Sequence, residues 1–355
     1  MKTRLDHPGA LAQGMVQGTF ESLRQFGQQL QSGPALASHL GVRPAQGVRS
    51  AVYCGLGGSG IAGDLLQAAL GEDLRLPWLV HRSYGLPPFA DRATLAVISS
   101  YSGNTEEALD AFAQARAKDC RILCVTSGGE LLKKASADQL PCIQLPSGLA
   151  PRNSLGYALS ALLCAVHRLG LAPDPSGPLQ QAAESAHERS RLLGLDTPLK
   201  ANPAKHLARR LHGRLVLIYG GSGLTAPIAR RWRGQITENA KQLAWTAALP
   251  EMNHNEIAGW EHPHEVLKHT VAVFLRDQDE HPRLARRFDL TRRYLQDKAG
   301  DTIECDSNGE SRLDRMVSLL QLIDWASVYL AILNGSDPES IEAIEHIKRR
   351  LSEEA

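Results

Sequence analysis

The sequence has little net charge, few aromatic residues and no paired cysteines. Among its 355 residues, 39 basic and 38 acidic side chains leave a formal net charge of +1, so no overall field favours nucleic acid or an anionic membrane. The six cysteines form no CxxC pair and most lie in apolar runs, which indicates reduced, buried thiols rather than disulfides. We interpret local arginine clusters, within residues 230–233 and 286–293, as solvated helix faces.

Long hydrophobic segments are also missing. No uninterrupted apolar run approaches the about 18 residues that span a bilayer, and residues 161–166 are typical of the longest. Residues 1–13 lack the continuous apolar region of a secretory signal. We therefore expect a cytoplasmic protein with neither a membrane nor a nucleic-acid partner.

The length and the pattern of apolar runs predict an α/β fold with about two domains. Strand-like runs alternate with helical stretches in both halves, which is typical of parallel sheets flanked by helices. The predicted strands are residues 51–54, 78–80, 94–100, 122–125, 142–145, 215–219, 271–275 and 302–304. The predicted helices include residues 61–70, 106–118, 155–169, 282–298, 312–333 and 341–351.

The chain divides into a helical N-terminal segment and two related α/β lobes. We expect the helical segment over residues 1–47, the first lobe over 48–172 and the second, with a helical C-terminus, over 179–355. Prolines and a glycine mark residues 171–178 as the linker. A GGSG loop follows a strand and precedes a helix in each half, at residues 57–60 and 220–223, which indicates an internal duplication.

The first glycine loop is compatible with several ligands. Residues 55–60 read GLGGSG and satisfy the GxGxxG pattern of dinucleotide sites, in which backbone amides approach an anion at a helix N-terminus. Such sites also need an acidic residue after the second strand, but residues 78–82 read WLVHR. A sugar or phosphate loop around Gly57, Gly58 and Ser59 fits better, and a structural turn is the remaining alternative.

A turn rich in hydroxyl groups follows the third predicted strand. Ser100, Ser102 and Thr105 lie within six residues, next to Gly103, where the strand ends and a helix begins. Hydroxyls and free amides at this position can bind a phosphate monoester without a metal. One helix cap needs only one hydroxyl, so we predict a phosphate site.

Several motifs together resemble the bifunctional phosphoglucose/phosphomannose isomerase family, whose members contain sugar isomerase (SIS) domains. The resemblance covers nearly the whole chain from residue 48. The motifs are the SYSGNT turn after a GGSG loop, PR at 151–152, ENAK at 238–241, PEMNHNE at 250–256 and IEHIK at 344–348. The resemblance implies two SIS lobes and an enzyme that interconverts aldose and ketose 6-phosphates through a cis-enediol.

Glu238 and Arg152 match the residues that the family uses for proton transfer and charge stabilisation. An aldose–ketose isomerase needs a base that moves a proton between C1 and C2, and a partly buried Glu238 suits that task. A nearby cation stabilises the enediolate, which is the role that the resemblance implies for Arg152.

His254 and Lys348 complete the implied catalytic set. An imidazole can open the pyranose ring near neutral pH, and in related enzymes this histidine reaches the site from the partner subunit, which implies a homodimer. The resemblance places Lys348 near the ring oxygen or O1. Residues 339–341 depart from the family's pattern, so mannose activity is less firmly implied than glucose activity.

Other interpretations remain open. His254, Glu261, His262 and His264 could suggest zinc, but the sequence has no HExxH motif and enediol chemistry needs no Lewis acid, so we expect no metal and no cofactor. Glu251 and Glu256 could flank a glycosidic bond. A non-catalytic sugar-phosphate sensor, or an isomerase of another phosphosugar, are the alternative functions.

Overall fold

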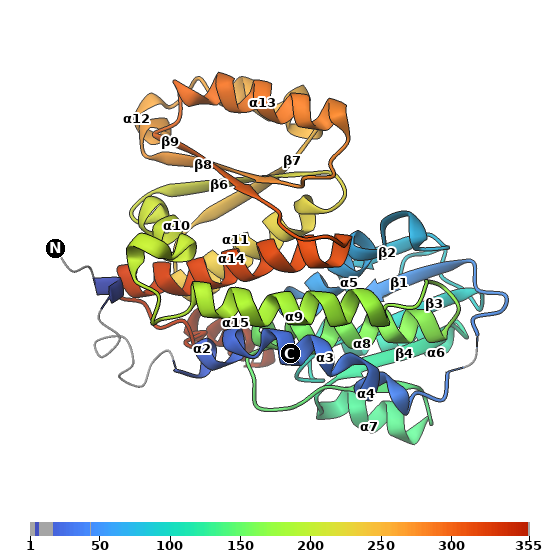
Figure 1. Cartoon of the computed structure of the whole chain (residues 1–355). Coiled ribbons are helices and arrows are strands. Elements are labelled where there is room, and N and C mark those ends of the chain that lie inside the picture. Colours follow the sequence, from blue (N-terminus) through green and yellow to red (C-terminus); the bar gives the residue numbers. More distant parts are fainter. Residues whose placement is uncertain (1–3, 7–16, 43, 354–355) are drawn as a thin grey trace.

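The computed structural model describes residues 4–6, 17–42 and 44–353, and it contains two parallel sheets with helices between and around them (Figure 1). The predicted fold class, two α/β lobes with a helical C-terminus, is therefore confirmed. Part of the predicted helical segment 1–47 lies outside the described residues. Its described part forms η1 (Arg4–Asp6), α2 (Gln17–Arg24), α3 (Phe26–Gln31) and α4 (Gly33–Ser38).

The first lobe has a five-stranded sheet in the order β2-β1-β3-β4-β5. β1 and β3 are buried along almost their whole length, because helices cover both faces, and this explains their continuous apolar runs. The strands are β1 (Ser50–Cys54), β2 (Trp78–His81), β3 (Thr94–Ser99), β4 (Arg121–Thr126) and β5 (Cys142–Gln144). The helices are α5 (Gly57–Leu70), η2 (Gly71–Asp73), α6 (Glu106–Ala117), α7 (Gly129–Ala137), η3 (Pro151–Ser154) and α8 (Leu155–Arg168).

The second lobe has a four-stranded sheet in the order β7-β6-β8-β9. α13 covers one face, and α11 and α14 cover the other (Figure 1). The strands are β6 (Leu215–Gly221), β7 (Ala244–Leu249), β8 (Thr270–Arg276) and β9 (Asp301–Asp306). The helices are η4 (Leu199–Ala201), α10 (Pro203–Leu211), α11 (Thr225–Ala240), η5 (Glu251–His254), η6 (Glu256–Gly259), α12 (His264–Lys268), α13 (Pro282–Gln296) and α14 (Arg312–Asn334).

Two differences from the sequence-based expectations have a clear physical reason. β7 was not predicted, because it is an edge strand that contains three alanines and has only its two end residues buried. The predicted linker 171–178 is too long at its C-terminal end, since α9 (Ser176–Leu193) begins inside it. Pro178 lies in the first turn of α9, where a proline is compatible with a helix.

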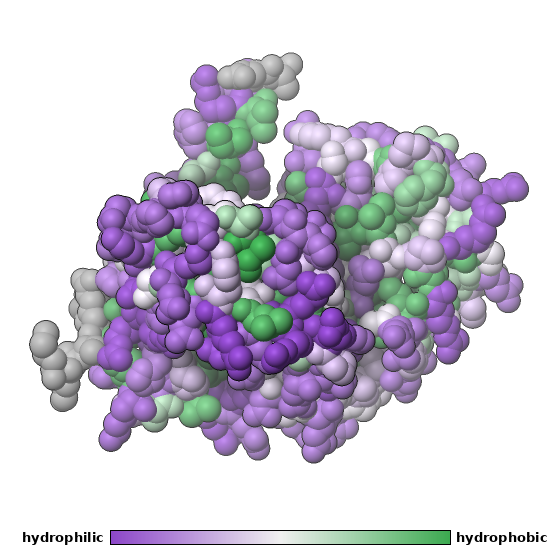
Figure 2. Space-filling view, turned by 90° about the horizontal axis from the view of Figure 1, so that it is seen from above, coloured by the Kyte–Doolittle hydropathy of each residue, from purple (hydrophilic) through white to green (hydrophobic). Residues whose placement is uncertain are grey.

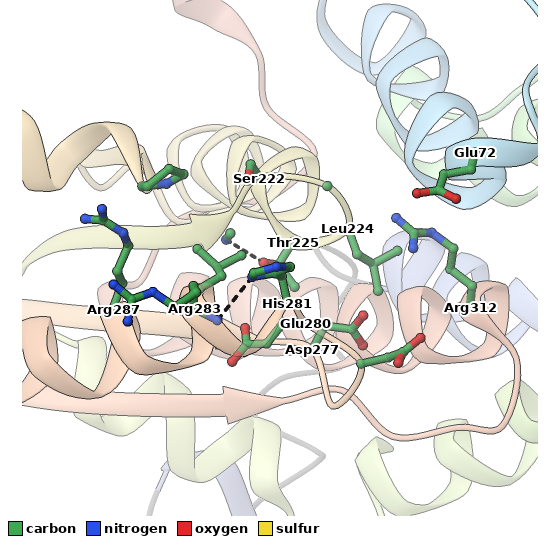
Figure 3. A pocket seen from close by; sticks show the side chains of 15 residues that line it. Glu72, Ser222, Leu224, Thr225, Asp277, Glu280, His281, Arg283, Arg287 and Arg312 are labelled. Atoms are coloured by element: carbon green, nitrogen blue, oxygen red, sulfur yellow. Dashed lines mark hydrogen bonds between the residues drawn. The ribbon is translucent and has the colours of Figure 1, made fainter.

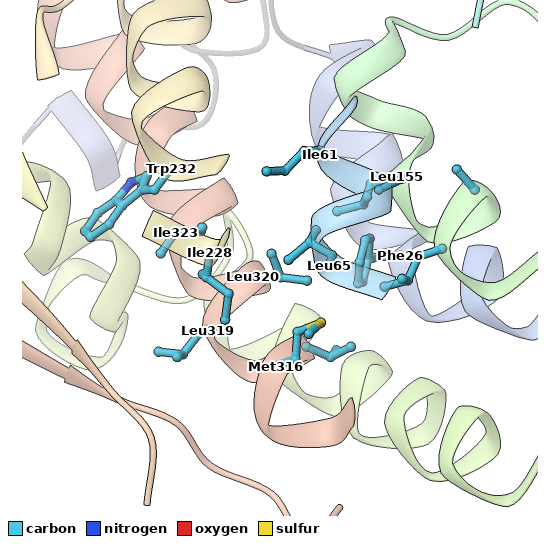
Figure 4. Packing of buried hydrophobic residues seen from close by; sticks show 14 of the residues in the cluster. Phe26, Ile61, Leu65, Leu155, Ile228, Trp232, Met316, Leu319, Leu320 and Ile323 are labelled. Atoms are coloured by element: carbon cyan, nitrogen blue, oxygen red, sulfur yellow. The ribbon is translucent and has the colours of Figure 1, made fainter. Parts of the chain in front are cut away.

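One hydrophobic core connects the two lobes. It runs from the inner face of the first sheet, through α5, α11 and α14, to the inner face of the second sheet. Figure 4 shows Ile61 and Leu65 of α5 facing Leu320 and Ile323 of α14. Because apolar side chains of both lobes interlock here, the position of α5 relative to α11 is fixed by packing.

α14 is the central helix of this core. By length and composition it could cross a membrane, but 89% of its most apolar window is buried inside the protein. This helix is the only one of that kind in the described part of the chain. A core helix between two sheets accounts for its apolar composition.

The last helix, α15 (Glu342–Glu353), stands apart from the rest of the chain. It forms the projection at the upper edge of Figure 2, and its residues 342–351 are all exposed. Ile344, Ile347 and Leu351 form an apolar stripe that is between 41% and 59% exposed. Side chains spaced by three and four residues lie on one face of a helix, so α15 presents an unpaired apolar face.

Candidate active site

A cavity of about 660 Å³ lies between the two lobes. On one side it is lined by the loop that begins α5 and by η3, and on the other side by α11 and β7. It brings together four predicted site residues that are far apart in the sequence: Gly57, Gly58, Arg152 and Glu238. This convergence, between lobes that resemble each other, makes the cavity the candidate active site.

Arg152 and Glu238 form an ion pair at the cavity wall. Arg152 Nη1 donates to Glu238 Oε2 at 3.3 Å, and the two side chains are 4% and 29% exposed. Arg152 Nε donates to Asn239 Oδ1 at 2.9 Å, and its Nη2 donates to the carbonyl of Pro338. Burial lowers the pKa of Arg152, and Glu238 opposes that shift, but an arginine remains charged at neutral pH. The guanidinium is therefore a fixed cation beside a carboxylate that solvent and substrate can reach.

The ENAK segment fixes this arrangement from behind. Asn239 Nδ2 donates to Ser327 Oγ of α14 at 2.9 Å, so its carbonyl oxygen is oriented toward Arg152. Lys241 has left-handed backbone geometry at the end of α11, and its Nζ donates to the carbonyls of Asp337 and Ser340 at 2.8 and 2.7 Å. These contacts connect the helix that carries Glu238 to the segment before α15.

The first GGSG loop lies directly against the arginine turn. A Cβ on Gly58 would lie 2.9 Å from the backbone nitrogen of Arg152 and 2.9 Å from the carbonyl carbon of Pro151. Cβ atoms in proteins do not come this close to backbone atoms, so only glycine fits here. Gly57 has a φ of +51°, which favours glycine. Gly58 therefore allows the close approach of the two backbone segments, and Gly57 allows the left-handed turn that begins α5 at the cavity wall.

The hydroxyl-rich turn is adjacent to this loop but does not line the cavity. Tyr101 N donates to Ser59 Oγ at 3.0 Å, which connects the two loops. The hydroxyl of Ser100 is buried, where it accepts from Gly103 N at 3.1 Å and lies 2.8 Å from Thr105 Oγ1. Ser102 is exposed and Thr105 is partly exposed. Ser100 thus shapes the turn, and the phosphate-binding role of the group remains a prediction.

Sequence reasoning missed the arginines that surround the cavity. Arg82, Arg230 and Arg233 line the cavity. Asp64 forms an ion pair with Arg82 and a second one, at 3.3 Å, with Arg230. The spacing of these arginines from Glu238 in the sequence could have revealed them, because residues 230, 233, 237 and 238 share one face of α11. The interpretation of this cluster as a solvated face was incomplete, since its three arginines, Arg230, Arg231 and Arg233, all line a cavity.

It was wrong for Arg231, which is buried and pairs with Asp324 of α14 at 2.6 Å. Gln235 Nε2 also donates to Asp324 Oδ1, at 3.1 Å, and Arg231 Nη2 donates to the carbonyl of Arg152 at 3.1 Å. Arg231 therefore connects the core helix to the turn that carries Arg152.

Two predicted catalytic residues lie away from the cavity of their own chain. His254 is exposed at the end of η5, and Lys348 is exposed on the projecting α15. Neither lines the cavity, and neither side chain has a hydrogen bond or ion pair within the described residues. Their roles, like those of the other site residues, stay predictions.

Glu251, Glu256, His262 and His264, which the sequence suggested for other kinds of site, contact neighbouring side chains. Glu256 Oε1 accepts from Tyr219 at 2.6 Å, and Glu251 Oε1 accepts from Asn255 at 3.0 Å. The rings of His262 and His264 are 4.7 Å apart, but across residues 4–6, 17–42 and 44–353 no three histidine, cysteine or acidic side chains form a metal-binding group.

Known proteins resemble this chain along most of its length. Residues 200–351 match the model of the bacterial phospho-glucose isomerase C-terminal SIS domain. A bifunctional phosphoglucose/phosphomannose isomerase of Caldicellulosiruptor bescii is 38% identical over 335 residues, which cover 94% of this chain and 99% of that protein. A protein of the same description from Aquifex aeolicus is 39% identical over 305 residues, which cover 86% of this chain and 91% of the relative.

A solved structure shares the fold. The glucose-6-phosphate isomerase like protein from Thermus thermophilus has a TM-score of 0.64 and 22% identity, and the match covers 97% of this chain and 98% of that protein. Sequence similarity at 38% identity along almost the entire relative is a closer relationship than fold alone. On that similarity, the chain belongs to the bifunctional phosphoglucose/phosphomannose isomerase family.

Proposed function

We propose that this protein interconverts glucose 6-phosphate, and also mannose 6-phosphate, with fructose 6-phosphate. The observation that carries the proposal is the Arg152–Glu238 pair in the cavity between the lobes, in a chain of this family. An isomerase needs a proton acceptor next to a fixed positive charge, and this pair supplies both.

The chemistry follows from the two side chains. Glu238 removes the C2 proton of the open-chain aldose, and the electrons of that C–H bond form the C1–C2 double bond of a cis-enediolate. The developing negative charge on the sugar oxygen is stabilised by Arg152, whose position is preset by Asn239 and Pro338. A proton passes from O2 to O1, and the C2 carbonyl forms as Glu238 returns its proton to C1, which gives the ketose. Return of a proton to either face of C2 produces the glucose or the mannose epimer.

The loops beside the cavity are suited to hold the phosphate and the sugar. The turn of Ser102 and Thr105 lies at the start of α6, where helix amides favour an anion. Arg82, Arg230 and Arg233 add positive charge around the cavity. This charge favours a phosphorylated sugar over a neutral one.

A second copy of the chain would complete the site. His254 and Lys348 are exposed and outside their own cavity, and α15 carries its unpaired apolar stripe away from the chain. Trp245 of the edge strand β7 and Leu243, just before that strand, are 54% and 66% exposed and offer apolar surface next to η5. In a homodimer, His254 of one protomer would open the sugar ring in its partner, and Lys348 would reach the ring oxygen.

The cellular setting is also a proposal. All six cysteines are free thiols and four of them are buried, which fits a protein of the reducing cytoplasm.

The test is proton NMR of fructose 6-phosphate in D2O with wild-type protein, with Glu238→Gln and with the control Glu188→Gln. Glu188 is exposed on α9 and has no partner in the described structure. We expect C2-deuterated glucose 6-phosphate, with mannose 6-phosphate beside it, from the wild type and the control. Loss of an essential base typically slows the reaction about 10²- to 10⁴-fold, so Glu238→Gln should give almost no product.

Other outcomes separate the alternatives. Binding of fructose 6-phosphate without any deuterium exchange in the wild type would favour the sensor. Exchange only with a different phosphosugar would favour another isomerase, and full activity of Glu238→Gln would refute the assigned base.

A further inference from the structure

A second cavity, of about 440 Å³, lies at the carboxyl ends of β6 and β8 in the second lobe (Figure 3). Its wall consists of the second GGSG loop, the segment between β8 and α13, and parts of η2 and α14. It shares no lining residue with the cavity between the lobes. The isomerase site therefore leaves this second glycine loop without a role.

Two helix N-termini meet at this cavity. α11 begins at Thr225 and α13 begins at Pro282, and residues from both first turns line the wall. Gly221 N donates to Thr225 Oγ1 at 2.7 Å, which shapes the turn. The amides of Gly223 and Leu224 have no acceptor among the described residues. Free amides and two helix dipoles favour an anion at this point.

Three arginines at the cavity lack a carboxylate partner within the described part of the chain: Arg283, Arg287 and Arg312. Arg287 Nη1 lies 3.4 Å from Asn253 Oδ1, and Arg312 Nε donates to Ala68 O at 2.6 Å, and both acceptors are neutral. In Figure 3, Arg283 and Arg287 lie on one side of the cavity and Arg312 on the other. Their charges are thus available to a ligand.

Most of the acidic residues at the cavity are paired with an arginine. Asp277 and Asp279 pair with Arg315 at 2.8 and 3.2 Å, and Glu280 pairs with Arg276. Glu72 of η2 is the acidic lining residue without an ion pair in the structure as described. Three of the four lining carboxylates are therefore paired, whereas Arg283, Arg287 and Arg312 keep charges that no carboxylate of the described structure pairs.

A buried carboxylate oxygen is an independent sign of a ligand. The side chain of Glu280 is 9% exposed, and its Oε1 accepts from Arg276 Nε at 2.7 Å. Glu280 lines the cavity, and its Oε2 is buried and has no hydrogen-bond partner among the described residues. A buried acceptor without a donor is unfavourable, so a donor in the cavity would stabilise the protein. A hydroxyl group is such a donor.

We propose that this cavity is a second ligand site, which binds a phosphate monoester that carries hydroxyl groups. The phosphate lies against the second GGSG loop and the three arginines, and a ligand hydroxyl donates to Glu280 Oε2. The site is separate from the proposed isomerase site, so it stands or falls independently of that function.

The first test uses D-glucitol 6-phosphate, which has no carbonyl group and cannot be isomerised. Phenylglyoxal modifies accessible arginines, and peptide mass spectrometry of the full chain reports each one. We expect D-glucitol 6-phosphate to protect Arg283 and Arg287, but not Arg286, which is exposed on the same helix outside the cavity. Equal modification of all three at every ligand concentration would overturn the proposal.

The second test is calorimetric titration of the wild type, of Arg283→Gln/Arg287→Gln and of the control Arg286→Gln. Wild type and control should bind two molecules of D-glucitol 6-phosphate per chain. The double variant should retain one and bind the other at least about tenfold more weakly, since two charge-assisted contacts are lost. Binding by the double variant that equals that of the wild type, or the same loss in the control, would refute the second site.

Glu280→Gln tests the hydroxyl contact. We expect it to weaken D-glucitol 6-phosphate several-fold while inorganic phosphate binds as before, whereas unchanged binding of both would refute this contact. Isomerase turnover of each variant is measured separately, so a failure of either proposal is recognised on its own.

Discussion

Arg152 and Glu238 are 86 residues apart in the sequence, yet their side chains meet at 3.3 Å across the boundary between the lobes. The contact is set by two further residues, because Asn239 and Pro338 hold the other nitrogens of the guanidinium. Neither lobe alone contains both members of the pair. The proposed chemistry therefore depends on how the lobes pack.

Replacing Arg152 tests whether the orientation of this cation matters. Lysine in Arg152→Lys keeps the charge but cannot reproduce the three contacts of a planar guanidinium. We expect kcat to fall about 10²- to 10³-fold while KM changes little, since the contact acts mainly on the enediolate. Steady-state kinetics beside Arg209→Lys, an exposed arginine of α10, measures this. A change confined to KM would show that Arg152 only binds substrate.

Mixing two inactive chains tests the proposed dimer. Glu238→Gln and His254→Ala each remove one residue, and a hybrid dimer contains one site in which both are intact if His254 crosses the interface. After denaturation and joint refolding, we expect about a quarter of wild-type activity, because about half of the dimers are hybrids with one good site. If His254 acts within its own chain, the mixture stays inactive.

Asp324→Asn tests the buried ion pair behind the site. It leaves Arg231 buried without a counter-charge, and such a loss typically lowers the free energy of unfolding by about 3–5 kcal/mol. The exposed pair Arg210–Asp301 is the matched comparison. Asp301→Asn should lower the free energy of unfolding by less than about 1 kcal/mol. Urea unfolding of both variants decides this, and equal effects would contradict it.

The cysteines provide a test that depends on pH. Burial raises the pKa of Cys54 and of Cys305 to about 12, and that of Cys142 and of Cys164 to about 11, from an ordinary 9.0. At pH 8 a thiol of pKa 12 has about a thousandfold less thiolate than an ordinary one.

We expect these thiols to react slowly with iodoacetamide at pH 8 and faster as the pH rises toward 11. Unfolding in guanidinium should expose all six cysteines at once. Rapid labelling of Cys54 or Cys305 in the native protein would show that this part of the core opens easily.

Sequence patterns predicted most of the elements because those elements have strong local signals. β1 and β3 are continuous apolar runs, and α6 follows its predicted range within a residue. β7 was missed because an alanine-rich edge strand has neither a continuous apolar run nor strict alternation. α9 was not predicted, and its first turn falls in the predicted linker because Pro178 marks a break in a sequence and yet fits a first helical turn.

The features of the candidate site also divide into those that local sequence predicts and those that depend on tertiary packing. The sequence by itself determined the two α/β lobes, the paired GGSG loops and the motifs that contain Arg152 and Glu238, because each depends on neighbouring residues. Only the tertiary structure decided that Arg231 is buried against Asp324, that Arg230 and Arg233 face a cavity, and that Arg283 and Arg287 have no carboxylate partner in the described structure. The partners of a charged side chain come from distant segments, and their distances are set when helices and sheets pack, so local patterns do not contain them.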